Sequence, residues 1–407
     1  MASSGASFEQ PRMLPSIIIL GMRLAVYCPW VHLIGGIERT LLELMQRSRH
    51  EVTIYTHRFR AELTYPGLSG RVIEFKPPVS VERSMTPLVG AAWRIARTEL
   101  SERDADALLV SSNDLGDLIM ARTRLPAACY CWTPLKILHD PALREGLRRR
   151  DKRKSQALSV LGPALDAVDR RMWRRYDHAF VCSGEVLRRV QNARLVPSGP
   201  AEVLHPGVDL EWFFDDGRSR EDFLLVAGRI KWWKNVDLAI AGFAEAVRRG
   251  GRLSLVIAGV VDPYDENYLE SLRAQAAGLP VRFETGPSQE RLRELLRGCR
   301  ALVFPTLNED FGMVPLEAMA CGAPVIAVDA GGPRESVVDG ETGWLVPPTA
   351  HAFADAMLEA TSTSRAEEMR TAARARAAQF SWDRFVRRVD DVMDEILDRR
   401  RVAQANP

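Results

Sequence analysis

Short apolar runs alternate with segments of helical spacing along almost the whole chain, and this alternation limits the folds open to it. In the first half, the runs expected to be strands are Leu24–Tyr27, Val52–Thr56, Val72–Phe75, Ala107–Val110, Ala128–Cys131 and Ala179–Cys182. In the second half they are Phe223–Ala227, Leu253–Ala258, Val281–Glu284, Ala301–Phe304, Val325–Val328 and Trp344–Val346. Such alternation predicts parallel sheets whose strands are joined by crossover helices. Because 407 residues are too many for one ordinary core, we expect two α/β domains.

A segment rich in Pro, Gly and Asp, HPGVDLEWFFDDGRSRED, separates the two series and is typical of a linker. Two Rossmann-like domains joined there would face each other across a cleft, the usual place for a ligand. The segment FSWDRFVRRVDDVMDEILDRR has helical spacing near the C-terminus. We therefore predict an N-terminal extension (1–21), a first domain (22–204), a second domain (205–380) and a C-terminal helix with its tail (381–407).

The overall composition excludes several classes of protein. A formal net charge of +2 gives the chain no general attraction to nucleic acid. No apolar run approaches the roughly 20 residues that a helix needs to cross a bilayer. The six cysteines are scattered through apolar runs, which indicates buried free thiols in a reducing, cytoplasmic compartment rather than disulfides. Cys129 and Cys131 have no second pair nearby, so no metal site is expected there.

The stretch PTLNEDFGMVPLEAMA places two carboxylates, Glu309 and Glu317, eight residues apart. The apolar run before it predicts that Glu309 lies on a loop at the carboxyl end of a strand. The helical pattern that starts at Pro315 predicts that Glu317 lies one turn into the next helix. In open parallel sheets ligands bind at this end of the strands, where the N–H groups of a helix start also favour anions. Two carboxylates at one such place could bind two sets of sugar hydroxyls.

Two further loops carry residues suited to a diphosphate. In LLVAGRIKWWKNVDLAIAGF, Arg229 and Lys234 lie between a strand and a helix, where Arg binds phosphate as a fork and Lys as a point charge. In WVHLIGGIERTLLEL, Gly35 and Gly36 also lie between a strand and a helix, and glycine lets the backbone approach a phosphate closely. The alternatives are a solvated basic loop and an ordinary helix start.

These segments together resemble the retaining glycosyltransferases of family 4, which have the GT-B fold. The resemblance runs from about Met22 to about Arg388 and includes the family's Glu-x7-Glu spacing. It implies a C-terminal helix that crosses back onto the first domain, so that Trp382 and Phe385 pack rather than react. It also implies a nucleotide-diphosphate sugar as donor and co-substrate, with no further cofactor.

The resemblance assigns a role to each of these residues. Arg229 and Lys234 would hold the diphosphate, next to the first glycine loop. Glu317 would bind the ribose hydroxyls, and Glu309 would contact the transferred sugar. The amides of Phe311, Gly312 and Met313 would line that sugar, and the strand around Arg282–Glu284 would edge the base. Gly331, Gly332 and Glu335 match a further family loop, whose expected role is turn geometry.

The acceptor side departs from the family pattern. ACYCWTPLKILHD resembles a segment of a bacterial subgroup with many mannosyltransferases, in which the pattern is Cys-His-Thr-Pro with a following Arg and a later Asp. Trp132 stands at the His position and Lys136 at the Arg position, while Asp140 fits. The indole could stack on a sugar, and His139 is a candidate substitute for the missing His. GDP-mannose and UDP-sugars therefore both remain possible donors, and the acceptor could be a glycan, a lipid-linked oligosaccharide or a small molecule.

Two basic runs, LREGLRRRDKRK and RRMWRRYDH, indicate a possible contact with an anionic membrane surface. Trp173 and Tyr176 are interleaved with the arginines of the second run. The alternative is a solvated helix face that acids elsewhere balance.

Three other classes of function compete with transfer. A glycoside hydrolase also uses paired carboxylates, but it has no need of the two cations or the glycine loop. A sugar-nucleotide epimerase shares the two-domain fold but is not expected to carry the Glu309/Glu317 loop. A catalytically silent scaffold has no need to keep Arg229, Lys234, Glu309 and Glu317 together. We therefore predict a metal-independent retaining transferase that reacts at the front face of the sugar, in which catalysis rests on positioning and on stabilising the leaving diphosphate.

Overall fold

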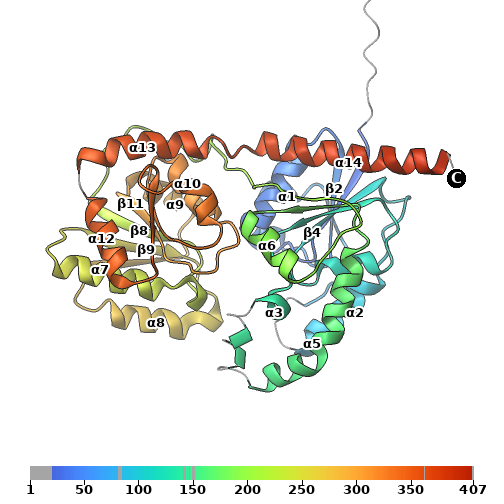
Figure 1. Ribbon diagram of the computed structural model, residues 1–407, viewed down its shortest axis with the longest axis horizontal. Helices are drawn as coiled ribbons and strands as arrows, with labels where there is room; N and C mark the ends of the chain where they lie inside the picture. Colours follow the sequence, from blue (N-terminus) through green and yellow to red (C-terminus); the bar gives the residue numbers. More distant parts are fainter. Residues whose placement is uncertain are drawn as a thin grey trace, which may run out of the picture.

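Two parallel sheets, each with helices on its faces, make up the chain (Figure 1). The computed structural model describes residues 21–80, 85–140, 144–145, 147–148, 152–361 and 363–405, so most of the predicted N-terminal extension lies outside the described residues. The exact domain boundaries stay predictions. The expected architecture of two Rossmann-like domains is confirmed.

The first sheet has the strand order β3-β2-β1-β4-β5-β6-β7, and its neighbouring strands pair in parallel. Its strands are β1 (Arg23–Tyr27), β2 (Glu51–Thr56), β3 (Val72–Glu74), β4 (Ala107–Ser112), β5 (Ala127–Cys131), β6 (His178–Val181) and β7 (Ala201–Val203). The central strands β4 and β5 are buried on both faces because helices cover the sheet, and this is why the sequence shows them as continuous apolar runs. The short edge strand β7 was not predicted.

The second sheet has the order β10-β9-β8-β11-β12-β13 and is also parallel. Its strands are β8 (Phe223–Ala227), β9 (Ser254–Gly259), β10 (Val281–Thr285), β11 (Ala301–Phe304), β12 (Val325–Val328) and β13 (Gly343–Val346). Every one of them lies within a residue of its predicted range. In both sheets the strand order reverses next to the first strand of the series, which is where open parallel sheets bind ligands.

Crossover helices connect these strands. In the first domain they are α1 (Gly36–Arg47), α2 (Met85–Arg97), α3 (Lys136–His139), α5 (Lys152–Trp173) and α6 (Gly184–Asn192), with a 3-10 segment η3 (Gly116–Ala121) after β4. In the second they are α7 (Val236–Arg248), α8 (Glu266–Gln275), α9 (Gln289–Gly298), α10 (Met313–Ala320) and α11 (Pro333–Ser336), with η4 (Trp232–Lys234) before α7. Two further helices, α12 (Ala350–Glu359) and α13 (Thr363–Ala377), follow the last strand. Among the described helices, none is both long enough and apolar enough to cross a bilayer.

The last helix, α14 (Trp382–Ala405), crosses back and lies along the first domain, as predicted (Figure 1). Trp382 and Phe385 are 3% and 1% exposed, so they pack as expected. Arg49 at the end of the α1 region pairs with Asp391 over 2.9 Å and with Asp394 over 2.5 Å. Where the chain leaves the second domain it lies beside the linker, and the Val208 amide donates to the carbonyl of Phe380 over 3.0 Å.

All six cysteines are buried and none forms a disulfide, as the sequence indicated.

Candidate functional site

The loop between β11 and α10 carries the first of the paired carboxylates. Glu309 lies on this loop, and Glu317 lies one turn into α10, which confirms the placement expected from the sequence. Gly312 turns the chain into the helix with a φ of +89°, a left-handed conformation that side chains other than glycine adopt only with strain. The turn that separates the two carboxylates therefore requires a glycine at position 312.

Lys234 reaches this loop from η4. Its Nζ donates to Oε2 of Glu309 over 2.5 Å, and both side chains are largely buried. Burial by itself would raise the pKa of the Glu309 carboxyl, but Lys234, with Lys136 and Arg229 further away, holds that pKa below its usual range. Glu309 is thus a carboxylate in a cationic surrounding, as a site for a diphosphate requires.

Arg229 is exposed at the start of the same strand-to-helix loop. It lies near enough to Glu309 to help lower the pKa of that carboxyl, and near enough to Glu38 to oppose a rise in its pKa. The structure therefore brings both predicted cations near Glu309, Lys234 in direct contact and Arg229 within electrostatic reach.

Two other carboxyls at the interface are less fully neutralised. Burial raises the pKa of Glu317 to about 7, and Arg39 on α1 opposes this effect. Burial likewise raises the pKa of Glu38 to about 7, against the effect of nearby backbone amides and of Arg229. A buried carboxyl without a close cation gains most from hydroxyl donors, so Glu317 suits a ligand rich in hydroxyls.

Both glycine loops lie close against the carboxylate loop. Gly36 of the first domain meets Met313 of the second, because a Cβ at Gly36 would lie 2.6 Å from the sulfur of Met313. Within the second domain, a Cβ at Gly332 would lie 2.2 Å from Cα of Phe311. The Gly332 amide also donates to the carbonyl of Glu309 over 3.0 Å. The loop that was expected to have only a turn role therefore supports the Glu309 loop directly.

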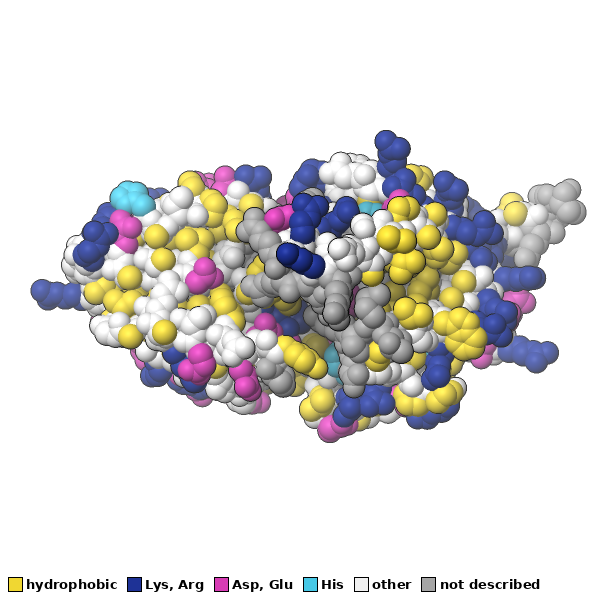
Figure 2. Space-filling model, turned by 90° about the horizontal axis from the view of Figure 1, so that it is seen from below, with side chains coloured by type: hydrophobic (Ala, Val, Ile, Leu, Met, Phe, Trp, Pro, Cys, Tyr) yellow, Lys and Arg dark blue, Asp and Glu magenta, His cyan; other side chains and the backbone are white. Residues whose placement is uncertain are grey.

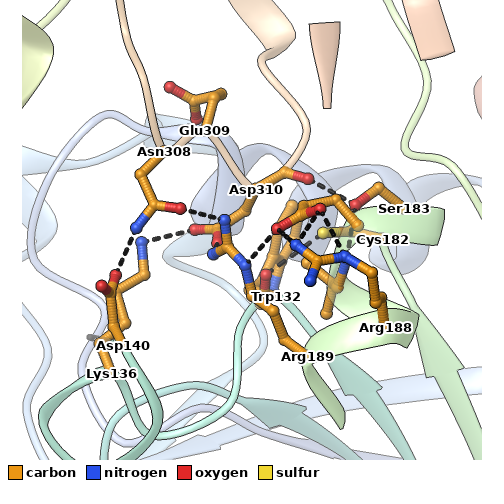
Figure 3. Close-up of polar contacts among 12 residues, drawn as sticks. Trp132, Lys136, Asp140, Cys182, Ser183, Arg188, Arg189, Asn308, Glu309 and Asp310 are labelled. Carbon is orange, nitrogen blue, oxygen red and sulfur yellow. Dashed lines mark hydrogen bonds and ion pairs between the residues drawn. The ribbon is translucent and has the colours of Figure 1, made fainter. Parts of the chain in front are cut away.

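The acceptor-side candidates Lys136 and Asp140 lie against the same loop (Figure 3). Lys136 Nζ donates to Oδ2 of Asp310 over 2.6 Å, and Asn308 donates to Oδ2 of Asp140 over 2.6 Å. Both contacts cross from the first domain to the second. Their predicted role toward an acceptor stays a prediction, but the structure adds a partner for each.

The other two acceptor-side candidates pack within the first domain. Trp132 is partly buried, donates from its ring nitrogen to Ser111 Oγ over 3.2 Å and meets Tyr130 edge to face. His139 lies 3.3 Å from Oδ2 of Asp169 through Nε2. Sugar stacking by Trp132 and substitution by His139 also stay predictions.

Residues that the sequence reasoning missed surround this loop. Arg189 on α6 donates to Asp310 Oδ1 over 2.5 Å and to the side chain of Asn308. Ser183, which caps α6, donates to the Asp310 carbonyl over 2.5 Å. The sequence carries only part of this signal: Asn308 and Asp310 directly flank Glu309, but nothing in it marks Arg189 or Ser183 as their partners.

Glu335 forms a second contact with α6. It accepts from the amide of Gly184 over 2.9 Å and from that of Glu185 over 3.2 Å, and it lies 2.8 Å from His205 Nε2. Burial would raise the pKa of Glu335, but His205 and the two amides hold it below its usual range. This carboxylate therefore helps to hold the domains together.

One feature of the membrane prediction is wrong. Trp173 and Tyr176 are fully buried, and Tyr176 donates to Asp117 over 2.6 Å, so these aromatic side chains belong to the core rather than to a basic surface. Trp173 is the last residue of α5, Tyr176 follows in the turn after it, and the two rings meet edge to face in the core. Much of the other basic run, residues 143–154, lies outside the described residues.

A hollow of about 360 Å³ lies away from these residues, at the amino ends of β8, β9 and β10. Ser254, Val281 and Arg282 are among the residues that line it. Because parallel sheets bind ligands at the opposite, carboxyl ends of their strands, we do not assign the hollow to the donor. Glu284, further along β10, is paired with Arg291 over 2.9 Å.

Comparison with known families agrees with this arrangement. Residues 34–212 match the family described as Glycosyltransferase Family 4, and residues 209–380 match Glycosyl transferases group 1. A D-inositol 3-phosphate glycosyltransferase of Streptomyces avermitilis is 35% identical over 414 residues, which cover 90% of this chain and 85% of that protein. These matches confirm the family resemblance found in the motifs.

Other relatives match over shorter stretches. The alpha-1,3/1,6-mannosyltransferase alg-2 of Neurospora crassa is 34% identical over 185 residues, covering 36% of this chain and 39% of that protein. An inositol-phosphate glycosyltransferase of Frankia alni is 38% identical, and the match covers 36% of this chain and 40% of that protein. For several curated relatives, therefore, the matched part is less than half of their length.

Solved structures agree on the fold. Anabaena Alr3699/HepE, in complex with UDP and glucose, superposes with a TM-score of 0.69 at 17% identity, over 92% of this chain and all of that one. Sucrose-phosphate synthase from Thermosynechococcus elongatus gives a TM-score of 0.68 at 20% identity, over 92% of this chain and 99% of that one. At these identities the likeness concerns the fold alone.

Proposed function

This chain belongs to glycosyltransferase family 4, and we propose that it transfers a hexosyl group with retention from a nucleoside-diphosphate sugar, either GDP-mannose or a UDP-sugar. The acceptor is a glycan, a lipid-linked oligosaccharide or a small molecule. The observation that carries the proposal is the contact of Lys234 with Glu309, with Arg229 beside them at the carboxyl ends of the second sheet. A sugar diphosphate has the matching groups, hydroxyls for the carboxylate and phosphate oxygens for the cations.

The names of two relatives narrow the acceptor. One is a D-inositol 3-phosphate glycosyltransferase and the other a mannosyltransferase. A phosphorylated polyol and a mannosyl-accepting glycan are therefore the first acceptors to test with this chain.

The proposed reaction depends on charge rather than on a nucleophile. Lys234 and Arg229 neutralise the diphosphate as its bond to the sugar breaks, so negative charge that develops on the leaving oxygen is stabilised where it forms. Glu309 accepts hydrogen bonds from hydroxyls of the transferred sugar and fixes its orientation. Glu317 accepts from the ribose hydroxyls. The acceptor then attacks from the face that the diphosphate leaves, which retains the configuration.

Calorimetry with UDP-, GDP- and dTDP-sugars tests the donor assignment, with Glu317→Ala as the control. Binding of one nucleotide sugar that is at least tenfold weaker in the variant supports the site. If no nucleotide sugar binds the wild-type chain, or if the variant binds as tightly, the donor assignment fails. An acceptor-independent conversion of a UDP-sugar into its epimer would support the epimerase alternative.

A contact with an anionic membrane is the second part of the proposal, because an apolar surface on α2 and α5 lies among basic side chains. The surface comprises Val89 and Trp93 on α2 and Val160, Leu161, Leu165 and Val168 on α5, with Val160 76% and Trp93 62% exposed. Figure 2, seen from below, shows hydrophobic side chains gathered on the first-domain side, with Lys and Arg around them. Exposed basic residues of these helices and the following turn are Arg97, Lys152, Arg171 and Arg174. Apolar side chains inside a basic rim fit an anionic lipid surface.

Co-sedimentation with phosphatidylglycerol-containing and purely zwitterionic vesicles tests this contact. The wild-type chain is expected to bind the anionic vesicles at low salt, and a Trp93→Ser, Leu165→Ser variant is expected to lose most of that binding. Equal binding by the variant, or none by the wild type at low salt, would remove the membrane contact from the proposal.

A further inference from the structure

The two residues that flank Glu309 are held by the other domain. Asn308 contacts Asp140 and Arg189, and Asp310 contacts Lys136 and Arg189. Figure 3 shows Asn308 and Asp310 directed into the first domain, while Glu309 between them is directed away from it. The first domain thus holds the loop on both sides of Glu309, which faces the proposed donor.

The first-domain partners are themselves fixed. Arg189 is only 12% exposed and its Nε also donates to Glu185 over 2.8 Å, within α6. Ser183 caps α6 by accepting from the Val186 amide over 3.1 Å, and it donates to the Asp310 carbonyl. A charged side chain that is buried and bonded at two points has little freedom to follow a moving loop.

Asp310 accepts hydrogen bonds from three side chains of the first domain, Lys136, Arg189 and Ser183. Its carboxylate accepts from Lys136 Nζ over 2.6 Å and from Arg189 Nη1 over 2.5 Å, and it is 19% exposed. Two charge-assisted bonds to separate helices fix both the position and the rotation of the carboxylate. The backbone of the next residue toward the N-terminus, Glu309, follows from that position.

We propose that Asp310 is a positioning residue of the donor site: Lys136 and Arg189 of the first domain hold it, and through it they set the direction of the Glu309 carboxylate toward the transferred sugar. The inference rests on the proposed function, because it gives Asp310 its role through the sugar contact of Glu309. It follows that the sugar subsite is complete only when the two domains are together, although the Glu309 loop belongs to the second domain. Lys136 thereby serves the donor as well as any acceptor that lies near α3.

The consequence is specific to the sugar. Lys234 and Arg229 lie on another loop, and neither has a described contact with Asp310; Lys234 contacts Glu309 instead. Loss of the Asp310 carboxylate should therefore weaken the binding of a nucleotide sugar. It should leave the affinity for the free nucleoside diphosphate almost unchanged. A general loosening of the domains would instead weaken both ligands together.

The experiment measures, by calorimetry, the dissociation constants of UDP and UDP-glucose and of GDP and GDP-mannose, for the wild type, Asp310→Asn, Lys136→Met and Glu309→Gln. For the pair that the wild type binds, Asp310→Asn and Lys136→Met are expected to weaken the nucleotide sugar about fivefold or more relative to the diphosphate, in the same direction as Glu309→Gln. Lys136→Arg is expected to keep the wild-type ratio, because the longer guanidinium still donates to Asp310. Thermal denaturation shows that each variant is folded.

A double variant separates positioning from an independent contact. If Asp310 acts only through Glu309, adding Asp310→Asn to Glu309→Gln leaves the ratio unchanged, since the two effects are not additive. Arg400→Gln is the matched control, because it removes an ion pair of 3.1 Å between α14 and Asp177 far from the loop. It is expected to leave both constants unchanged.

The results that overturn the inference differ from those that overturn the function. If Glu309→Gln changes the ratio and Asp310→Asn does not, or if Asp310→Asn weakens both ligands equally, the positioning role is wrong and the donor assignment stands. If the wild type binds none of the four ligands, the proposed function fails and the inference fails with it.

Discussion

The two domains contribute to the site in different ways. The second domain carries the groups proposed to touch the donor, namely Arg229, Lys234, Glu309 and Glu317. The first domain contributes Lys136, Arg189 and Ser183, and each of them donates a hydrogen bond to Asp310 on the loop of the second domain. The groups proposed to bind the ligand therefore come from the second domain, and contacts that position them come from the first.

The largest effect is expected where backbone meets backbone inside the second domain. Gly332→Ala places a methyl group 2.2 Å from Cα of Phe311, where neither atom can move aside without moving the loop. We expect a loss of unfolding free energy of about 1–3 kcal/mol and at least tenfold weaker donor binding. Thermal denaturation and calorimetry measure the two.

Two alanine variants in the first domain provide the matched controls. At Gly36 the added methyl meets the flexible side chain of Met313, so a smaller effect is expected. At Gly90 nothing lies within 4 Å, and alanine within α2 should stabilise by up to about 1 kcal/mol. Equal effects at Gly332 and Gly36 would contradict the expectation that a contact with fixed backbone costs more than one with a flexible side chain.

Lys234→Ala tests the cation that the second domain supplies. Because a charge-assisted contact contributes roughly 1.5–3 kcal/mol, turnover at saturating donor is expected to fall at least tenfold. Release of the nucleoside diphosphate reports this rate. A near-native rate would remove Lys234 from the diphosphate site.

The pH dependence of stability tests the second carboxylate. Burial raises the pKa of Glu317 to about 7 from its ordinary value of 4.5, so the folded chain holds this proton more tightly than the unfolded chain. The carboxyl therefore costs stability increasingly as pH rises from about 4.5 to about 7, and the cost stays constant above that range. Glu317→Gln removes this cost, so the variant should melt higher than the wild type at pH 8, by at least about 2 °C, and close to it at pH 4.5.

Glu317→Gln should bind the donor more weakly than the wild type, although its folded state is more stable at pH 8. The amide of Gln accepts fewer hydrogen bonds from ribose hydroxyls than a carboxylate, and its NH₂ group adds a donor. A difference in melting temperature that is the same at both pH values would show that the Glu317 carboxyl is not the source.

The smallest effect is expected from the N-terminal segment. Deletion of residues 1–21 should leave donor binding and turnover within about twofold, because β1 begins at Arg23 and the contacts described for the site lie elsewhere. A soluble but inactive truncated chain would contradict this.

Much of the fold could be predicted because its signals are local. Continuous apolar runs mark strands that helices cover on both faces, and the Glu309–Glu317 spacing identifies a strand, a loop and a helix within one stretch. The strand β7 was missed because Ala201–Val203 is only three residues long and partly exposed, too short to show a pattern.

The rest of the site could not be predicted because its contacts are distant in sequence. Arg189 lies 121 residues from Asp310, and nothing near Arg189 marks it as other than a surface arginine of a helix. Trp173 and Tyr176 led to a wrong prediction because their neighbouring arginines suggest a surface, whereas the turn that ends α5 directs both rings into the core. In both cases the information lies in which helix face meets which loop, and only the tertiary structure provides it.

The chain passes between the domains twice, and the two passages lie side by side at Val208 and Ser381. Gly207 lies so close to this crossing that a Cβ there would be 2.5 Å from the amide nitrogen of Trp382. Both connections between the domains therefore lie together, and the Asp310 contacts join the two domains at a separate place. The second passage leads into α14, which packs on the first domain. A single cut in the exposed part of the linker would therefore give two fragments that packing alone holds together, so the nicked chain should migrate as one molecule until it is denatured.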